Sequence, residues 1–147
     1  MKKISIYRIL FALHLFVGIG ALAGGLAAIT DPWEPLGVSA VYLKNSPFTN
    51  YLIPGVILFT VIGIGNIVSA FTFRFKSKYQ GYISSIFSWA LVIWIIVQCI
   101  MLRSIAALHV IFFIIGLIKA LLSMLMLFEY KLFPTNFVVD IYNRIKA

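Results

Sequence analysis

The sequence predicts an all-α protein: a four-helix transmembrane bundle followed by a short C-terminal amphipathic helix at the membrane interface. Hydrophobic residues make up 63% of the 147 residues, and charged residues make up only 11%. A soluble domain of this length cannot bury that much apolar surface, so lipid must surround most of the chain. Apolar runs long enough to span a bilayer lie at about residues 4–29, 51–73, 82–102 and 105–128.

The distribution of charge indicates a membrane topology rather than nucleic-acid binding. The formal net charge is +8, but the basic residues are grouped at the ends of apolar runs, as at Lys2, Lys3 and Arg8 and in the segment 74–78. Basic residues of this kind favour the cytoplasmic side of a membrane. We therefore expect both termini in the cytoplasm and the loop 30–50 outside, with no nucleic-acid partner.

The first apolar run, at 4–29, has the lysine-rich start of a signal peptide. It is longer than a signal-peptide core, and a poor cleavage site follows it, so we expect an uncleaved spanning helix. Gly18, Gly20, Gly24 and Gly25 give this run small residues four apart, Gly20 with Gly24 and Ala21 with Gly25, a spacing that lets two helices approach closely. The expected partner is the second helix, in which Gly65 and Ser69 have the same spacing, and the alternative is a second protomer packed against Gly20 and Gly24.

The loop 30–50 leads into the second helix through a proline-containing segment. Ser46 can cap a helix whose first residue is Pro47, because a proline at that position gives up only an N–H that has no helical partner. Pro54 would then lie about two turns inside the helix and remove a backbone hydrogen bond. We therefore expect a kink at Pro54.

The same region resembles a known group of proteins. The residues that carry the resemblance are Asp31-Pro32, the apolar run after Pro35 and Ser46-Pro47-Phe48-Thr49-Asn50-Tyr51-Leu52-Ile53-Pro54-Gly55. They look like the corresponding stretch of small bacterial four-helix integral membrane proteins whose activities are uncharacterised. The resemblance implies the four-helix fold and a bacterial plasma (inner) membrane. It implies no activity, so no functional residue is transferred from it.

The second half of the chain predicts a hairpin and a tail. Only Arg103 and Ser104 separate the third and fourth apolar runs, so these two helices should form a tight antiparallel pair. After Pro134, the segment at about 135–146 places apolar residues on one helical face and polar residues on the other. We expect it to lie on the inner leaflet as a lipid-surface anchor, with a partner-binding helix as the alternative.

Ionisable groups inside the membrane are the main candidate functional residues, because each is costly to insert. Lys119 lies nine residues before Phe128, and nine residues of helix span roughly 14 Å. His14 lies at a similar depth and Asn66 a little nearer the inner surface, so we expect the three to converge, with His14 or Asn66 accepting a hydrogen bond from the Lys119 ammonium. No acid lies at that depth. The alternative is that the lysine snorkels toward the inner interface.

A second polar cluster is predicted near the outer side of the membrane. It contains Gln98, Arg103 and His109, with Asp31 and Glu34 in the facing loop. We expect Arg103 to pair with Asp31 or Glu34 and so tie the hairpin to the loop.

No catalytic or metal site is predicted. Without an acid in the membrane region, neither a Ser-His-Asp set nor a carboxylate pair is available. The two histidines, the single cysteine and the four acids lack the spacing of metal ligands, and we expect no cofactor. The favoured interpretation is a non-enzymatic accessory protein that binds a membrane partner or a second copy. The alternative is an oligomeric transporter or channel-like subunit for a small solute, lipid or proton, using Lys119, His14 and Asn66.

Overall fold

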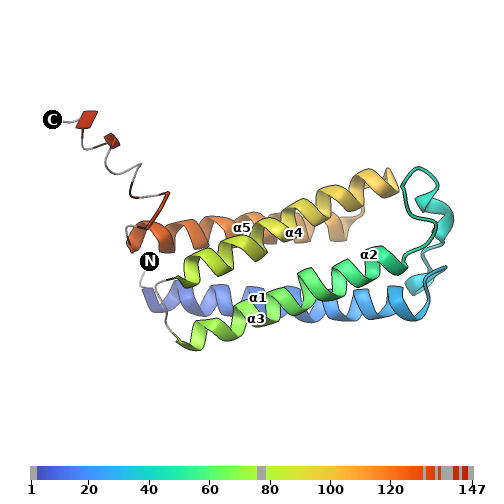
Figure 1. The fold of residues 1–147 in the computed structure, drawn as a ribbon, viewed down its shortest axis with the longest axis horizontal. Helices are drawn as coiled ribbons and strands as arrows, with labels where there is room; N and C mark the ends of the chain where they lie inside the picture. Colours follow the sequence, from blue (N-terminus) through green and yellow to red (C-terminus); the bar gives the residue numbers. More distant parts are fainter. Residues whose placement is uncertain are drawn as a thin grey trace.

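The structure, a computed structural model, describes residues 3–75, 79–130, 132–134, 136, 141–142 and 144–145. In this part of the chain, four helices are long and apolar enough to cross a membrane: Ser5–Thr30, Leu52–Phe75, Gln80–Leu102 and Ala107–Glu129. They form an all-α bundle, and the described residues contain no strand (Figure 1). The predicted fold class is confirmed.

The four spans are arranged as two neighbouring pairs. Helix α1 (Lys3–Thr30) packs along the second span, and α4 (Gln80–Leu102) packs along α5 (Ala107–Glu129). Contacts of α1 with α5, and of α3 (Gly65–Thr72) with α4, join the pairs. Figure 1 shows the start of α1 and the end of α5 at one end of the bundle and the loop that follows α1 at the other. We name these the terminal end and the loop end.

The second span is continuous but not uniform. It runs through α2 (Leu52–Ile57), a π-helical segment η3 (Leu58–Ile64), α3 and a final 3-10 turn η4 (Phe73–Phe75). Asn66 lies in the first turn of α3, directly after the π-helical segment. Such wider turns are rare in proteins, but those that occur are often found at functional sites.

The start of the second span differs from the sequence prediction. The helix does not begin at Pro47: the Ser46 hydroxyl and the backbone of Phe48 instead hydrogen-bond to each other in a local turn. The helix begins at Leu52, whose N–H donates to Asn50 Oδ1 over 3.1 Å. Pro54 is therefore in the first turn, where the backbone N–H groups have no helical acceptor. It removes no hydrogen bond there, so the reason for expecting a kink at Pro54 no longer holds.

The loop between α1 and α2 contains two short 3-10 turns, η1 (Pro35–Gly37) and η2 (Ala40–Leu43). Asp31 closes the turn that follows α1, because its Oδ1 atom accepts hydrogen bonds from the N–H groups of Trp33 and Glu34, at 3.3 and 3.1 Å. The aspartate thus has a structural role in shaping this loop.

Glycines do bring α1 close to the second span, but Gly18 and Gly25 approach it more closely than the predicted pair Gly20 and Gly24. A Cβ atom added to Gly25 would lie 2.6 Å from the backbone nitrogen of Phe59, and one added to Gly18 would lie 2.7 Å from a side chain of α3. A Cβ on Gly20 or Gly24 would meet no atom nearer than 3.5 Å. The face of closest approach therefore contains Gly18 and Gly25.

The rotation of α1 about its axis explains this difference. His14 is buried, and residues four and eleven positions further along lie on nearly the same face of a helix, which places Gly18 and Gly25 inward. On the second span, Gly65 faces Phe87 of α4 rather than α1. Ser69 does face α1, with its Oγ atom 3.4 Å from His14 Nε2.

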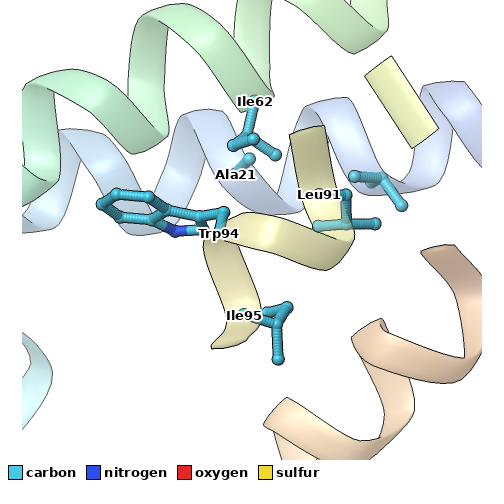
Figure 2. Close-up of a cluster of buried hydrophobic side chains, with 6 residues drawn as sticks. Ala21, Ile62, Leu91, Trp94 and Ile95 are labelled. Carbon is cyan, nitrogen blue, oxygen red and sulfur yellow. The ribbon is translucent and has the colours of Figure 1, made fainter. Parts of the chain in front are cut away.

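Three apolar clusters fill the bundle interior. The terminal cluster contains Ile6, Leu10, Phe73, Leu122 and Met126. The central cluster, drawn in Figure 2, contains Val17, Ala21, Ile62, Leu91, Trp94 and Ile95. The loop-end cluster contains Ala28, Leu43, Tyr51 and Met101. On every span, buried polar side chains lie between the terminal and central clusters.

The predicted amphipathic tail helix, at about 135–146, lies mostly outside the described residues. It remains a prediction.

Candidate functional site

A buried polar network lies inside the bundle between the terminal and central clusters, and all four spans contribute to it. Its side chains, each 0% exposed, are His14, Asn66, Ser69, Ser84, Ser88, Lys119 and Ser123. The structure thus brings together Lys119, His14 and Asn66, the three residues that the sequence placed at a common depth. It adds serines from α3, α4 and α5.

The Lys119 ammonium faces the bundle interior and does not reach an interface. Its Nζ atom donates a hydrogen bond to Asn66 Oδ1. The Asn66 amide is oriented by its other end, because Nδ2 donates to the carbonyl of Ile62 over 2.7 Å. Oδ1 is therefore the acceptor that the asparagine presents to the lysine.

His14 shares this acceptor. Its Nδ1 atom lies 2.7 Å from Asn66 Oδ1, and since that oxygen only accepts, Nδ1 must carry a hydrogen. The other ring nitrogen, Nε2, lies 2.8 Å from Ser84 Oγ and 3.4 Å from Ser69 Oγ. In a neutral imidazole, Nε2 then accepts a hydrogen bond from a serine hydroxyl.

Serine hydroxyls extend the network toward α5. Ser84 Oγ lies 2.7 Å from Ser123 Oγ, and Ser123 Oγ lies 2.7 Å from the Lys119 carbonyl oxygen. Each hydroxyl has one hydrogen, so the donors and acceptors along this series of hydrogen bonds can be arranged in one of two directions. With neutral His14, Ser123 donates to Ser84 and Ser84 donates to Nε2. With His14 protonated on both nitrogens, Nε2 donates to Ser84, Ser84 to Ser123, and Ser123 to the carbonyl.

The network contains no carboxylate. Among the described residues, the acids Asp31 and Glu34 lie in the loop, and Glu129 lies at the end of α5. An ammonium has three N–H donors, and in the described part of the chain Asn66 Oδ1 is the acceptor that the structure gives it. A buried cation held by one neutral acceptor is costly, because neither charge pairing nor full hydrogen bonding offsets its desolvation.

A polar stripe on α4 connects this network to the terminal end of the bundle. Gln80, Ser84 and Ser88 recur every four residues and are all fully buried, so they share one face of the helix. Within the described residues, neither the oxygen nor the nitrogen of the Gln80 side-chain amide has a hydrogen-bond partner. An unpaired buried amide is a natural contact for a water molecule or another small polar group.

Sequence reasoning missed Gln80, Ser84, Ser88 and Ser123. The signal that could have found them is their spacing, since polar residues four apart inside an apolar run mark an inward-facing stripe.

The predicted outer cluster does not form as expected. In the described part of the chain, no ion pair joins Arg103 to Asp31 or Glu34; Arg103 is exposed and ends α4 in a left-handed conformation, with φ of 47°. His109 caps the start of α5, where its Nδ1 atom accepts a hydrogen bond from Ala106 N–H over 3.0 Å. An exposed arginine needs no protein partner, since water and lipid headgroups can satisfy it.

Gln98 and His109, two residues of the predicted outer cluster, both line a separate cavity. They help to line a space of about 210 Å³ that extends from the central cluster toward the loop end. Trp94 also lines it, and its Nε1 atom is buried without a hydrogen-bond partner in the described residues. The cavity is therefore apolar with a few polar edges.

The described fold defines a multi-pass membrane protein with a polar network enclosed by its helices. Comparison of the chain with known protein families, with curated proteins and with solved structures finds no match.

Proposed function

We propose that this membrane protein is a channel-like or transporter subunit that takes up and releases a proton at the polar network. The observation that carries the proposal is the shared acceptor: the Lys119 ammonium and the His14 imidazole both donate to Asn66 Oδ1. Ionisable groups are retained inside a membrane mainly for proton or ion pathways, since a structural role is met more cheaply by apolar packing.

The arrangement favours one excess proton at a time. Lys119 and His14 are the ionisable groups of the network, and no carboxylate among the described residues offsets a second positive charge there. Two cations around one oxygen repel each other strongly where the dielectric constant is low. A proton on His14 therefore disfavours one on Lys119, and the reverse. The hydroxyl groups of Ser84 and Ser123 accommodate the change on His14 by rotation, and each of these two has a hydrogen-bond acceptor in both states.

The terminal end is the side from which a proton would enter. Gln80 and Ser84 form a polar stripe that leads from that end to His14. Toward the loop end, the polar network is followed by the apolar side chains of the central cluster, among them Ile62, Leu91 and Trp94 (Figure 2). One chain thus provides half of a path. Complete passage requires movement of this cluster or a second subunit, because four helices scarcely enclose a pore.

Reconstitution into liposomes tests the proposal. Vesicles that contain a pH-sensitive dye are given a membrane potential that is negative inside and so drives protons inward. The initial rate of internal acidification is then measured. The wild-type protein should acidify its vesicles faster than empty ones. Lys119→Met should reduce the rate to that of empty vesicles, whereas Lys44→Gln, which removes an exposed lysine in the loop, should retain it. Equal rates for wild type and Lys119→Met would contradict the proposal.

A second candidate, an accessory protein that binds a membrane partner, is favoured by the loop that follows α1. Its side chains Trp33, Leu36, Val41 and Tyr42 are between 60% and 83% exposed. Leu36 also adopts a left-handed φ of 53°, which is unfavourable for leucine. An exposed apolar group of this kind suits either a bilayer surface or a protein partner.

Site-specific crosslinking in cells tests this second candidate. A photoreactive residue at Tyr42 should capture a discrete membrane protein, while the same residue at Phe16, an exposed side chain in the middle of α1, should capture lipid. Lipid capture at both positions would remove the accessory role from this loop.

A further inference from the structure

A groove of about 730 Å³ opens between the end of α4 and the start of α5. It is formed by residues 95–105 on one side and residues 109–113 on the other. The helical part on α4 is about two turns long, or roughly 10 Å along the axis. The groove thus begins at the loop end, where a spanning helix leaves the membrane, and continues to acyl-chain depth.

The walls of the groove are apolar and open to the surroundings. Ile96, Ile100 and Val110 line it, and each is at least 45% exposed. Since these three side chains are exposed on the outside of the bundle, they meet whatever occupies the surrounding bilayer. A hydrocarbon chain is the kind of ligand that packs favourably against such apolar side chains.

The rim of the groove carries polar donors. Arg103 and Ser104 lie at the turn, and His109 lies in the first turn of α5. No ion pair occupies the Arg103 guanidinium among the described residues. In the neutral form of His109, Nδ1 accepts the Ala106 N–H, so the hydrogen is on Nε2 and is available to a ligand.

The backbone at Arg103 also points to a role for its charge. A helix that ends in a left-handed residue usually has glycine or asparagine there, because a side chain with a Cβ atom is strained. The chain carries arginine at this position, with φ of 47°. The backbone of Arg103 is therefore strained in a way that a glycine at this position would not be. The strained residue is the one that places a guanidinium at the mouth of the apolar groove.

We propose that this groove binds an anionic phospholipid. The phosphate is held by Arg103 at the rim, with Ser104 and His109 as further donors, and an acyl chain lies along Ile96, Ile100 and Val110. Charge complementarity selects the ligand, since arginine binds phosphate through paired hydrogen bonds. The position of the rim at the end of two spanning helices places it at headgroup level. This site is separate from the polar network and does not depend on its function.

Lipid binding to the purified full-length protein in mild detergent tests the proposal. Native mass spectrometry compares phosphatidylglycerol with phosphatidylcholine of the same acyl chains. The wild-type protein should retain phosphatidylglycerol more tightly. Arg103→Gln should weaken phosphatidylglycerol binding by roughly tenfold or more, since a charge-assisted contact is lost. Lys44→Gln, which removes another exposed cation at the loop end, should bind like wild type.

A second variant tests the groove without changing charge. Ile100→Trp should fill the groove and displace the lipid while Arg103 remains; the side chain is 69% exposed, so the larger residue leaves the bundle core untouched. Glycerol phosphate, the soluble headgroup, should not compete at equal concentration. Equal affinity for the two lipids, unchanged binding in Arg103→Gln, unchanged binding in Ile100→Trp or full competition by glycerol phosphate would each overturn the proposal.

Discussion

Lys119 and His14, on two different helices, donate to the same atom, Asn66 Oδ1. This relationship places the asparagine at the centre of the bundle, because one neutral oxygen satisfies donors from α1 and α5 while Nδ2 is fixed on the backbone of Ile62. A cationic group is thereby held in the middle of the bundle. It also means that the consequences of changing Lys119 depend on whether Asn66 is present.

The first prediction concerns this dependence. Replacing Asn66 with leucine removes the acceptor and leaves the ammonium buried without a partner, so stability should fall by about 3 kcal/mol or more. Lys119→Met alone removes the charge and leaves Asn66 Oδ1 paired with His14, so it should be neutral or stabilising by up to about 2 kcal/mol. Thermal or denaturant unfolding in detergent measures both.

The double variant completes this comparison. With Lys119→Met present, Asn66→Leu no longer strands a charge and should cost clearly less than it does alone, which a double-mutant cycle reports as a coupling energy. Strictly additive effects of the two substitutions would show that the lysine and the asparagine do not interact.

The second prediction separates two neighbouring glycines of α1. Gly25→Ala should destabilise the protein by about 1–3 kcal/mol, because the new Cβ atom would lie 2.6 Å from the backbone nitrogen of Phe59. Gly24→Ala should change stability by less than about 0.5 kcal/mol, since its nearest neighbour would be a leucine methyl group at 3.5 Å. If the Gly24 variant is the less stable of the two, the rotation of α1 described above is wrong.

The sequence predicted the parts of the fold that follow from transfer to lipid. Apolar runs marked the four spans, and counting residues along them put Lys119, His14 and Asn66 at a common depth. Depth does not define rotation about a helix axis, however. The spacing of small residues alone therefore could not separate Gly20 and Gly24 from Gly18 and Gly25, and the inward position of His14 was needed to do so.

Other features depended on competition between local hydrogen bonds. Ser84 and Ser123 are ambiguous in sequence, because a serine in a membrane helix can bond to its own backbone as readily as to a neighbouring helix. Ser46 could either cap a helix that begins at Pro47 or close a turn with Phe48. The structure has the turn, in which the Ser46 hydroxyl bonds to the backbone of Phe48. The Arg103 ion pair was not formed because an exposed cation at an interface has other partners.

The third prediction is the orientation in the membrane. We expect the loop end outside and the terminal end in the cytoplasm, because the basic residues Arg8 and Arg74 lie toward the terminal end, as the positive-inside pattern requires. Reporters inserted at Lys44 and fused after Ala147 read this directly. A reporter that works only in the cytoplasm should be active when it is fused to the C-terminus. A reporter that works only on the outer side should be active when it is inserted at Lys44. A C-terminal reporter active on the outer side would reverse the proposed direction of proton entry.

The central claim is that the Lys119 ammonium is held inside the bundle by Asn66 and does not snorkel to an interface. Solid-state NMR of the isotope-labelled chain in phospholipid bilayers measures this directly through the Lys119 Nζ resonance. The structure predicts a through-space correlation from Lys119 Nζ to the Asn66 side-chain carbon and none to lipid phosphorus, with Lys44 as the exposed comparison. A Lys119 Nζ signal that correlates with lipid phosphate, and not with Asn66, would contradict the account.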